Sequence, residues 1–478
     1  MTNRLFMDNM IKLQPTCLLV YLSTRLLVYS STKKPTRQLK MLEDFIKIHA
    51  EKQPDKMALI DDSVRYTYAQ LWKIVNERAE TWKNHLEHNN RAVILRASQK
   101  ADFLIDYFAI HRAGGVVVPL EKDTPEQQIK QLQDDLKNIT IPDQVADILY
   151  TTGTTGQSKG VMISHDTIIA DAENLIHGQG FTSNLAFVIN GPLNHIGSLS
   201  KAYPTIMLGS TIIIVDGLKD LNAFFDALDY PEEKVATFLV PASIRILLHF
   251  AEERLKNYCN KIDFIETGAA PMPHPDMLRL CNALPHTRLY NTYASTETGI
   301  ISTYNFNDGR CMAGCLGKPM PNSKIHITDE GRIACSGKTL MTGYAGDEAM
   351  TQKVLKDGMV FTADIGELDN EGMLHLKGRE DDVINVGGFK VAPTEVEDIA
   401  MELPQVKDCI CIQAEHPLLG NQLKLLVVTK DNLPLNKKNI ALHLKTKLES
   451  FKIPTAFQQV ESIQRTYNGK LNRKFYRQ

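Results

Sequence analysis

The sequence predicts an α/β protein with a large N-terminal domain of mostly parallel sheets, a small β region and a small α+β C-terminal domain. Its 478 residues exceed the roughly 100 to 200 residues of an ordinary domain, which favours two or three domains. Hydrophobic residues make up 43% and charged residues 23% of the chain, close to the averages of globular proteins. From residue 41 to about 230, helical patterns alternate with short β-branched runs, as in multi-layer α/β proteins.

Short apolar runs mark the expected strands. They lie at 92–95, 115–120, 185–190, 210–215, 236–240 and 261–268. The chain from Gln127 to Lys137 has a helical pattern. After residue 310 the Asp329-Glu330-Gly331 and Asn370-Glu371-Gly372 turns predict antiparallel hairpins. The final hundred residues then have the pattern helix, strand, strand, helix, which predicts the small α+β domain.

The first forty residues differ from the rest of the chain. They carry seven Lys or Arg and one acidic residue, and their apolar run, Cys17 to Thr24, is interrupted by Arg25. That run is shorter than the about 20 apolar residues that cross a bilayer. No small-residue cleavage site follows it, which disfavours a signal peptide. We therefore expect residues 1–40 to lie outside the fold and the natural protein to start at Met41.

Charge and cysteine content favour a small-molecule enzyme. The 54 basic and 56 acidic residues nearly balance, so no positive field would attract nucleic acid or anionic lipid. The eight cysteines contain no C-x-x-C pair, and Cys311 and Cys315 lack nearby His or Cys partners for a metal. We expect reduced thiols and a cytoplasmic protein.

A loop rich in glycine and threonine follows the apolar run that ends at Tyr150. Residues 150–161, YTTGTTGQSKGV, combine small residues with Lys159. Glycines let the main chain approach anionic oxygens, and backbone N–H groups donate to them, so the loop suits a polyphosphate. It is not a Walker A motif, because Ser158 stands where that motif has the glycine before its lysine. This excludes a P-loop kinase or ATPase.

Four motifs in order resemble those of the ANL superfamily of acyl-CoA synthetases, peptide-synthetase adenylation domains and luciferases. They are residues 150–161, NTYASTETG at 291–299, the long stretch 361–397, and RTYNGKLNR at 465–473. Thr152 stands where serine is usual, Ser158 where proline is usual, and Ala294 where glycine is common. The resemblance covers nearly all of the chain from Met41 onward.

The resemblance implies an ATP site. The expected ATP-binding residues are Thr151, Thr152, Gly153, Thr154, Thr155, Gly156, Lys159, Gly268, Ala269, Ala270, Asn291, Thr292, Tyr293, Ala294, Ser295, Asp364 and Arg379. An ionised carboxylate at Asp364 can accept from both ribose hydroxyls, and Tyr293 offers a ring face to adenine. Glu297 is expected to hold Mg²⁺, which prefers oxygen ligands beside nucleotide phosphates. Thr296 is expected to bond the α-phosphate. Without the resemblance, Thr296 and Glu297 suit the start of a helix.

The resemblance also implies two half-reactions, in which acyl-AMP and pyrophosphate form first and acyl-CoA and AMP second. Lys470 is expected to reach the site in the first step only, where its charge stabilises the α-phosphate. Asp381 matches the hinge about which the small domain rotates. After rotation, Gly387, Gly388, Phe389 and Lys390 are expected to bind CoA. The expected catalytic residues are Lys470, Thr296, Glu297 and His195, and the expected cofactors are ATP, Mg²⁺ and coenzyme A.

The acyl pocket is expected at residues 192–206, which contain no acidic residue. A substrate ammonium buried there would lack a partner, which favours fatty, aryl or other non-amino acids. His195 resembles the family's pocket-lining residue, although a lone histidine in an apolar stretch is otherwise commonly a core residue. Lys201 either meets a second substrate carboxylate, as o-succinylbenzoate would present, or points to solvent.

The expected domains are a 1–40 extension, a large adenylate-forming domain at 41–378, a hinge at 379–381 and a small domain at 382–478. The function we expect is that of an ATP-dependent carboxylic acid:CoA ligase. The alternatives are a stand-alone enzyme that loads a carrier protein, an o-succinylbenzoate-CoA ligase, and a catalytically silent nucleotide-binding homologue. The silent homologue is disfavoured because Lys159, Glu297, Asp364, Arg379 and Lys470 are all present.

Overall fold

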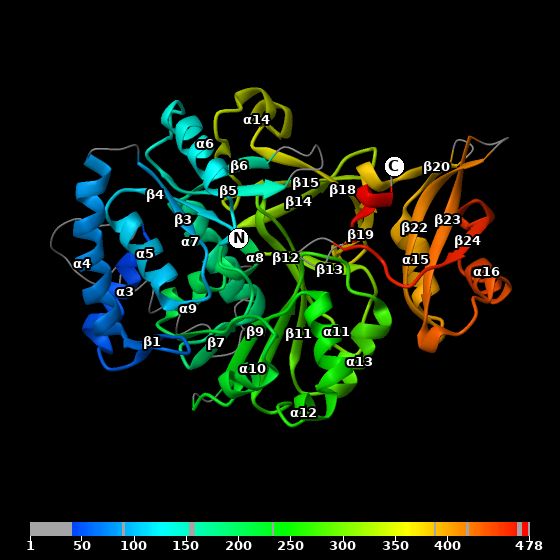
Figure 1. Cartoon of the computed structure of the whole chain (residues 1–478), viewed down its shortest axis with the longest axis horizontal. Helices are drawn as coiled ribbons and strands as arrows, with labels where there is room; N and C mark the ends of the chain where they lie inside the picture. Colours follow the sequence, from blue (N-terminus) through cyan, green and yellow to red (C-terminus); the bar gives the residue numbers. More distant parts are fainter. Residues whose placement is uncertain are drawn as a thin grey trace, which may run out of the picture.

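The structure is a computed structural model, which describes residues 41–87, 91–152, 158–231, 234–386, 389–416, 420–465 and 471–476. Residues 1–40 lie outside the described ranges, so a natural start at Met41 stays a prediction. The described part begins with α3 (Glu43–Lys52), and the colours of Figure 1 follow the chain from this helix to the C-terminal unit. None of the described helices is long and apolar enough to cross a membrane.

The smaller of the two main sheets has the strand order β16-β6-β5-β4-β3. Its strands are β3 (Ala92–Arg96), β4 (Val116–Leu120), β5 (Val145–Thr152), β6 (Ser158–Ser164) and β16 (Gly343–Tyr344), and its connecting helices are α4 (Tyr68–Glu87), α5 (Ala101–Arg112) and α6 (Glu126–Lys137). Strands β3, β4 and β5 are parallel, whereas β6 and β16 pair antiparallel. The predicted runs at 92–95 and 115–120 and the helix from Gln127 to Lys137 are therefore confirmed.

The larger sheet joins a parallel half to an antiparallel half. Its parallel strands are β1 (Met57–Ile60), β8 (Thr211–Ile214), β7 (Leu185–Ile189), β9 (Lys234–Phe238), β10 (Ile262–Thr267) and β11 (Arg288–Ser295), with β2 (Arg65–Thr67) antiparallel at the edge. Strands β7 and β8 are buried along their whole length, as continuous apolar runs in parallel sheets are. The prediction of a mostly parallel α/β domain is confirmed.

Helices cover this parallel half. They are α7 (His165–Gln179), α8 (Ile196–Leu199), α9 (Ala202–Leu208), α10 (Leu221–Leu228), α11 (Pro241–Phe250), α12 (Glu252–Lys256) and α13 (His274–Ala283). Helix α7 is capped at its N-terminus by Ser164, whose side chain accepts from the N–H of Thr167, and at its C-terminus by Gly180, whose φ of 68° suits glycine. In Figure 1, α10 to α13 lie together at the lower edge of the view.

The antiparallel half contains the two hairpins that the sequence predicted. Its strands are β12 (Gly299–Asn305), β13 (Cys315–Pro319), β14 (Ser323–Ile327), β15 (Arg332–Gly337), β17 (Leu355–Lys356), β18 (Met359–Leu368) and β19 (Leu374–Arg379), with α14 (Glu348–Val354) beside β16. Gly331 and Gly372 turn these hairpins with φ of 79° and 75°. L-residues rarely adopt this conformation, which is why the Asp-Glu-Gly and Asn-Glu-Gly turns were informative.

The C-terminal unit has its own core. It comprises the 3₁₀ turn η1 (Glu380–Asp382), the β20–β21 hairpin (Ile384–Val386, Phe389–Val391), α15 (Pro393–Met401), β22 (Val406–His416), β23 (Gly420–Thr429), the turn η2 (Lys430–Asn432), α16 (Lys437–Lys445), the turn η3 (Ser450–Lys452), β24 (Ala456–Gln459) and the turn η4 (Arg473–Tyr476). A separate cluster that includes Val391, Val396, Leu425 and Leu444 fills it. The helix-strand-strand-helix pattern is confirmed, and the unit lies to the right in Figure 1. The hinge at 379–381, which falls on the end of β19 and on η1, stays a prediction.

Candidate functional site

Strands β11, β18 and β19 bring three expected nucleotide-binding residues together. Asp364 on β18 lies opposite Arg379 on β19, and Nε of Arg379 is 3.3 Å from Oδ1 of the carboxylate. The hydroxyl of Tyr293 on β11 donates to Oδ2 of Asp364 at 2.8 Å. Burial and the neighbouring Asp364 raise the pKa of Tyr293 well above its ordinary value, so the phenol stays a donor. A half-exposed arginine beside a carboxylate can contact both a ribose and a phosphate.

A second group joins Lys159, Tyr344 and Glu297. Tyr344 on β16 donates its hydroxyl to Oε1 of Glu297 at 3.0 Å, and Nζ of Lys159 lies 5.5 Å from the centroid of its ring. Burial and the Glu297 carboxylate raise the pKa of Tyr344. The ring thus contacts Lys159 and its hydroxyl contacts Glu297, beside the end of the expected phosphate loop. Tyr344 was not predicted as a site residue, since it lies outside the four motifs.

Thr296 and Glu297 are not at the start of a helix. They lie in the turn between β11 and β12, and the backbone N–H of Met341 donates to the carbonyl of Glu297 at 2.9 Å. The expectation of a helix, formed without the resemblance, was therefore wrong. The reason is the strand pair itself, which sets Ser295 opposite Gly299, a residue with a φ of 68°. A tight turn at this edge holds the Glu297 carboxylate beside Tyr344.

The loop after β10 comes close to β11. A Cβ on Gly268 would lie 3.0 Å from the carbonyl oxygen of Thr292, so a side chain there would push the strands apart. Ala269 has a φ of 67°, which is unusual for a residue other than glycine, and Ala270 is half-buried beside it. Backbone held in a rare conformation is common at binding sites.

Other residues of the second motif make structural contacts. The side-chain amide of buried Asn291 donates to the carbonyl of Cys315, and the hydroxyl of Thr292 accepts from Gln179 and contacts Thr303. Ser295 exchanges hydrogen bonds with Thr298 across the turn, and Ala294 packs against the core. These contacts fix β11 and thereby the position of Tyr293. An ATP-binding role for Asn291 stays a prediction.

Lys201 does not point to solvent. Its side chain is 1% exposed, and its Nζ lies 2.7 Å from both carboxylate oxygens of Glu266, which is also 1% exposed. The centroid of the Phe238 ring lies 5.2 Å from the same Nζ. The solvent-facing alternative was wrong because Glu266, which precedes the Gly268 loop by two residues, supplies a buried partner. The sequence carried a signal for burial, because Lys201 lies in a mostly apolar stretch, but nothing in it identified Glu266 as the partner.

His195 lies at the start of α8 and contacts Glu121, the residue after β4. Its Nε2 is 2.9 Å from Oε1 of Glu121, and both side chains are partly exposed. His195 is therefore not a core histidine. Behind it, a Cβ on Gly197 would lie 3.3 Å from the ring of Phe238, so the start of α8 packs closely on β9.

The flanks of the phosphate loop are described, and its centre is not. Thr151 and Thr152 end β5, and Lys159 follows at the start of β6, where Thr151 and Lys159 face each other across the strand pair. Gly153, Thr154, Thr155 and Gly156 lie outside the described residues. Their expected phosphate contacts stay predictions.

In the C-terminal unit, Phe389 and Lys390 begin β21 and pair with Val386 and Asn385 of β20. Gly387 and Gly388, between the two strands, and Lys470 lie outside the described residues. Arg473, three residues after Lys470, lies 2.7 Å from Glu397 on α15 and 3.3 Å from Asp382 in η1, next to the expected hinge residue Asp381. Arg473 is thus joined by ion pairs to α15 and to the segment that is expected to act as the hinge.

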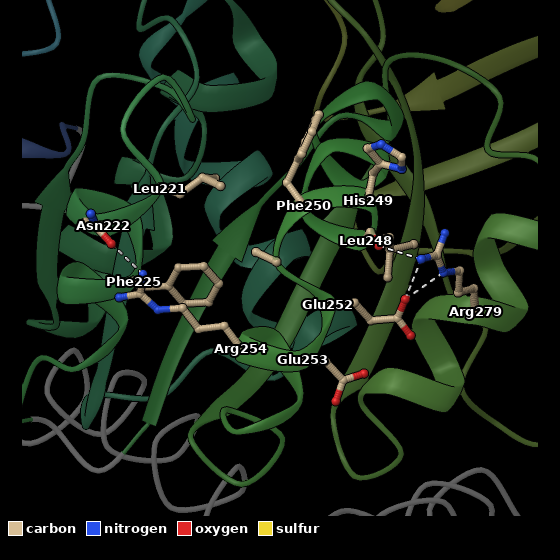
Figure 2. A pocket seen from close by; sticks show the side chains of 11 residues that line it. Leu221, Asn222, Phe225, Leu248, His249, Phe250, Glu252, Glu253, Arg254 and Arg279 are labelled. Atoms are coloured by element: carbon tan, nitrogen blue, oxygen red, sulfur yellow. Dashed lines mark hydrogen bonds and ion pairs between the residues drawn. The ribbon is translucent and has the colours of Figure 1, made fainter. Parts of the chain in front are cut away.

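A surface pocket of about 640 Å³ lies away from these groups, among α10, α11, α12 and α13. Figure 2 shows it lined by Phe225, Phe250 and the ion pair between Arg279 and Glu252. No expected site residue lines it.

Comparison with known proteins identifies the class to which this fold and site belong. The model of the AMP-binding enzyme family matches residues 46–137 and 131–345, and the model of the AMP-binding enzyme C-terminal domain matches residues 395–470. The chain therefore belongs to the AMP-binding enzyme family, within the ANL superfamily that its motifs resemble.

Individual relatives of the chain have low sequence identity to it. Over 91% of the chain it is 25% identical to the indoleacetate–CoA ligase of Aromatoleum aromaticum, of which it covers 98%. It is 23% identical to tyrocidine synthase 2 of Brevibacillus parabrevis over 91% of the chain, but it spans only 13% of that protein's length. The structure of ATP-bound MatB from Rhodopseudomonas palustris matches the fold with a TM-score of 0.81 at 22% identity, covering 91% of this chain and 98% of that one.

Proposed function

We propose that the chain is an AMP-forming carboxylic acid:CoA ligase. ATP and the acid form an acyl-adenylate and release pyrophosphate, and the thiol of CoA then attacks the acyl carbon and releases AMP. The observation that carries the proposal is that Tyr293, Asp364 and Arg379 meet on three strands of one sheet, because a carboxylate suited to a ribose then lies beside a cation suited to a phosphate.

The second group supplies the phosphate chemistry. Lys159 offers a positive charge to the departing phosphates, and Glu297 offers the oxygen ligand that Mg²⁺ prefers beside a nucleotide. Tyr344 fixes the Glu297 carboxylate by donating to one oxygen, which leaves the other oxygen for the ion. Thr296, in the same turn, is suited to bond the α-phosphate.

The acid is best matched by a fatty, aryl or other non-amino carboxylic acid. An amino acid needs a carboxylate to pair with its ammonium, and Glu266, the buried carboxylate beside the 192–206 stretch, is already neutralised by Lys201. The same ion pair disfavours a dicarboxylic acid such as o-succinylbenzoate, because Lys201 is occupied. Full-length similarity to a ligase of indoleacetate supports an acid without a free amine.

The acceptor is CoA in preference to a carrier protein. The chain covers 98% of the indoleacetate–CoA ligase but only 13% of tyrocidine synthase 2, so the CoA ligase is the relative of matching length. A stand-alone enzyme that loads a carrier protein is the second candidate.

The test is acid-dependent exchange of labelled pyrophosphate into ATP over a panel of fatty, aryl, dicarboxylic and amino acids. The best acid is then incubated with ATP and either CoA or a phosphopantetheinylated carrier protein. We expect exchange with a non-amino monocarboxylic acid and thioester formation on CoA with one AMP per thioester. Preference for amino acids would refute the assignment of the acid, and the absence of exchange with every acid would refute the proposed function.

A further inference from the structure

A buried group of polar side chains lies apart from the site described above. Glu43 on α3, His111 on α5 and Asp147 on β5 are each 1% exposed or less. Nδ1 of His111 is 3.0 Å from Oε1 of Glu43, and Nε2 is 2.9 Å from Oδ1 of Asp147. The ring of His165, the first residue of α7, lies edge-on to that of His111 with the centroids 5.1 Å apart. Four elements that are distant in sequence meet here.

Some polar atoms of this group have no hydrogen-bond partner. Oε1 of Glu43 faces His111, but among the described residues none hydrogen-bonds to its Oε2, although the side chain is almost fully buried. No hydrogen bond within the described ranges reaches a ring nitrogen of His165 either. A buried carboxylate oxygen without a donor costs free energy, because it has lost water and gained nothing in exchange.

The group combines two carboxylates with two imidazole rings in one cluster. Carboxylate oxygens and imidazole nitrogens are together common ligands of divalent transition metals.

We propose that Glu43, His111 and His165 form a buried binding site for a divalent transition metal of the zinc class. One ligand atom from each of the three lies within 4.8 Å of the others, so small side-chain movements bring them onto one ion. Two imidazole nitrogens and a carboxylate oxygen are a ligand set that zinc prefers, with the second oxygen of Glu43 or a water completing the shell.

Asp147 fits this site as the partner of a ligand. A histidine that binds a metal through one nitrogen commonly donates its other N–H to a carboxylate, which orients the ring and strengthens the bond. Nε2 of His111 has such a partner in Asp147, whose other oxygen accepts from the hydroxyl of Tyr107 at 2.8 Å. His111 would then be neutral and bind the metal through Nδ1.

The metal would have a structural role, because it would link separate elements of the fold. Lys159 lies near the start of β6, and His165 comes directly after the end of the same strand. Glu43 lies on α3, the first described helix. A metal shared by these residues would hold α3 against the strand that carries Lys159, whatever reaction the enzyme performs.

The test uses the whole protein, loaded with Zn²⁺ and passed over a desalting column. We expect about one zinc per chain by mass spectrometry of the metal, and d–d absorption of tetrahedral type after exchange for Co²⁺. His165→Gln should lower the retained zinc at least tenfold. His177→Gln, at the far end of the same helix, is the matched control and should retain it.

Two results would overturn the proposal. One is wild-type protein that retains less than a tenth of an equivalent of zinc after loading. The other is His165→Gln protein with wild-type zinc content. Should His165→Gln fail to fold, X-ray absorption at the zinc edge of the wild-type protein decides: two imidazoles and a carboxylate oxygen support the site, and sulfur ligands or water alone exclude it. None of these readouts depends on ligase activity.

Discussion

Asp364 and Arg379 occupy opposed positions on β18 and β19, and Nε of Arg379 lies 3.3 Å from Oδ1 of Asp364 while Tyr293 donates to Oδ2. Because Asp364 and Arg379 are cross-strand neighbours, the hairpin itself sets their separation. Strand β19 ends at this arginine, and the η1 turn begins at the next residue, Glu380. The proposed nucleotide contacts and the start of the expected hinge segment therefore meet at one residue.

The first prediction concerns Asp364→Asn. The amide lacks the negative charge of the carboxylate, which is proposed to accept a hydrogen bond from a ribose hydroxyl. Hydrogen bonds to charged groups contribute about 1.5 to 3 kcal/mol. We expect the KM for ATP in pyrophosphate exchange to rise about tenfold or more, with little change in the KM for the acid. Glu367→Gln is the matched control, because Glu367 lies on the same strand in an exposed pair with Lys377. An equal effect in both variants would contradict a ribose-binding role.

The second prediction separates the ring of Tyr344 from its hydroxyl. Tyr344→Phe keeps the ring near Lys159 but removes the donor to Glu297. We expect the Mg²⁺ concentration for half-maximal exchange to rise several-fold, because the carboxylate is no longer oriented. Tyr344→Leu should in addition raise the KM for ATP, since the contact with Lys159 is lost. If Tyr344→Phe leaves the Mg²⁺ dependence unchanged, Tyr344 does not position Glu297.

The third prediction concerns the buried pair of Lys201 and Glu266. Lys201→Met leaves a buried carboxylate without a partner, and such changes cost about 3 to 5 kcal/mol of unfolding free energy. The double variant Lys201→Met, Glu266→Leu removes both charges and should recover most of that loss. Urea unfolding of both variants measures the difference. Equal destabilisation of the single and double variants would mean that the charges do not interact as the 2.7 Å separation implies.

The fourth prediction is a pH dependence that arises from Asp171. Its side chain on α7 is 1% exposed and accepts from the N–H of Ile300 at 2.8 Å, and burial raises its pKa from 3.8 to about 8. The folded protein therefore holds a proton on this carboxyl that the unfolded chain releases near pH 4. Because the folded state binds this proton more tightly than the unfolded chain does, the Asp171 carboxyl favours folding most below pH 4. This contribution to the free energy of unfolding becomes progressively smaller as the pH rises to 8.

Asp171→Asn should remove that dependence. We expect the variant to gain on the order of 1 to 3 kcal/mol of unfolding free energy relative to wild type between pH 5.5 and pH 9. Urea unfolding at the two pH values measures it, with Asp166→Asn on the same helix as the control. A constant difference between variant and wild type at both pH values would contradict a buried, protonated Asp171.

The sequence predicted the fold well where patterns are local. The apolar runs at 185–190 and 210–215 became strands because continuous apolar segments can be buried on both faces of a parallel sheet. The Gly331 and Gly372 turns formed hairpins because glycine tolerates their positive φ. The family followed from motif order, and the model of that family matches the chain.

What the sequence did not predict depends on pairing between distant segments. Glu266 and Lys201 are 65 residues apart, and Tyr344 is 47 residues from Glu297, so no local pattern relates them. The Glu43–His111–Asp147 group was not predicted for the same reason. His111 and Asp147 lie within apolar segments, which signals buried partners without saying which ones, whereas Glu43 lies in an amphipathic helix and gives no such signal.

The most direct test of the proposed mechanism measures the two half-reactions separately in Lys470→Ala and Gly388→Leu. Lys470 is proposed to stabilise the α-phosphate in the first step, and Gly388 to leave room for the thiol arm in the second. We predict that Lys470→Ala loses adenylate formation by orders of magnitude yet converts supplied acyl-adenylate to thioester, and that Gly388→Leu does the reverse. Equal loss of both steps in each variant would contradict a mechanism in which one site performs the two reactions by rotation of the small domain.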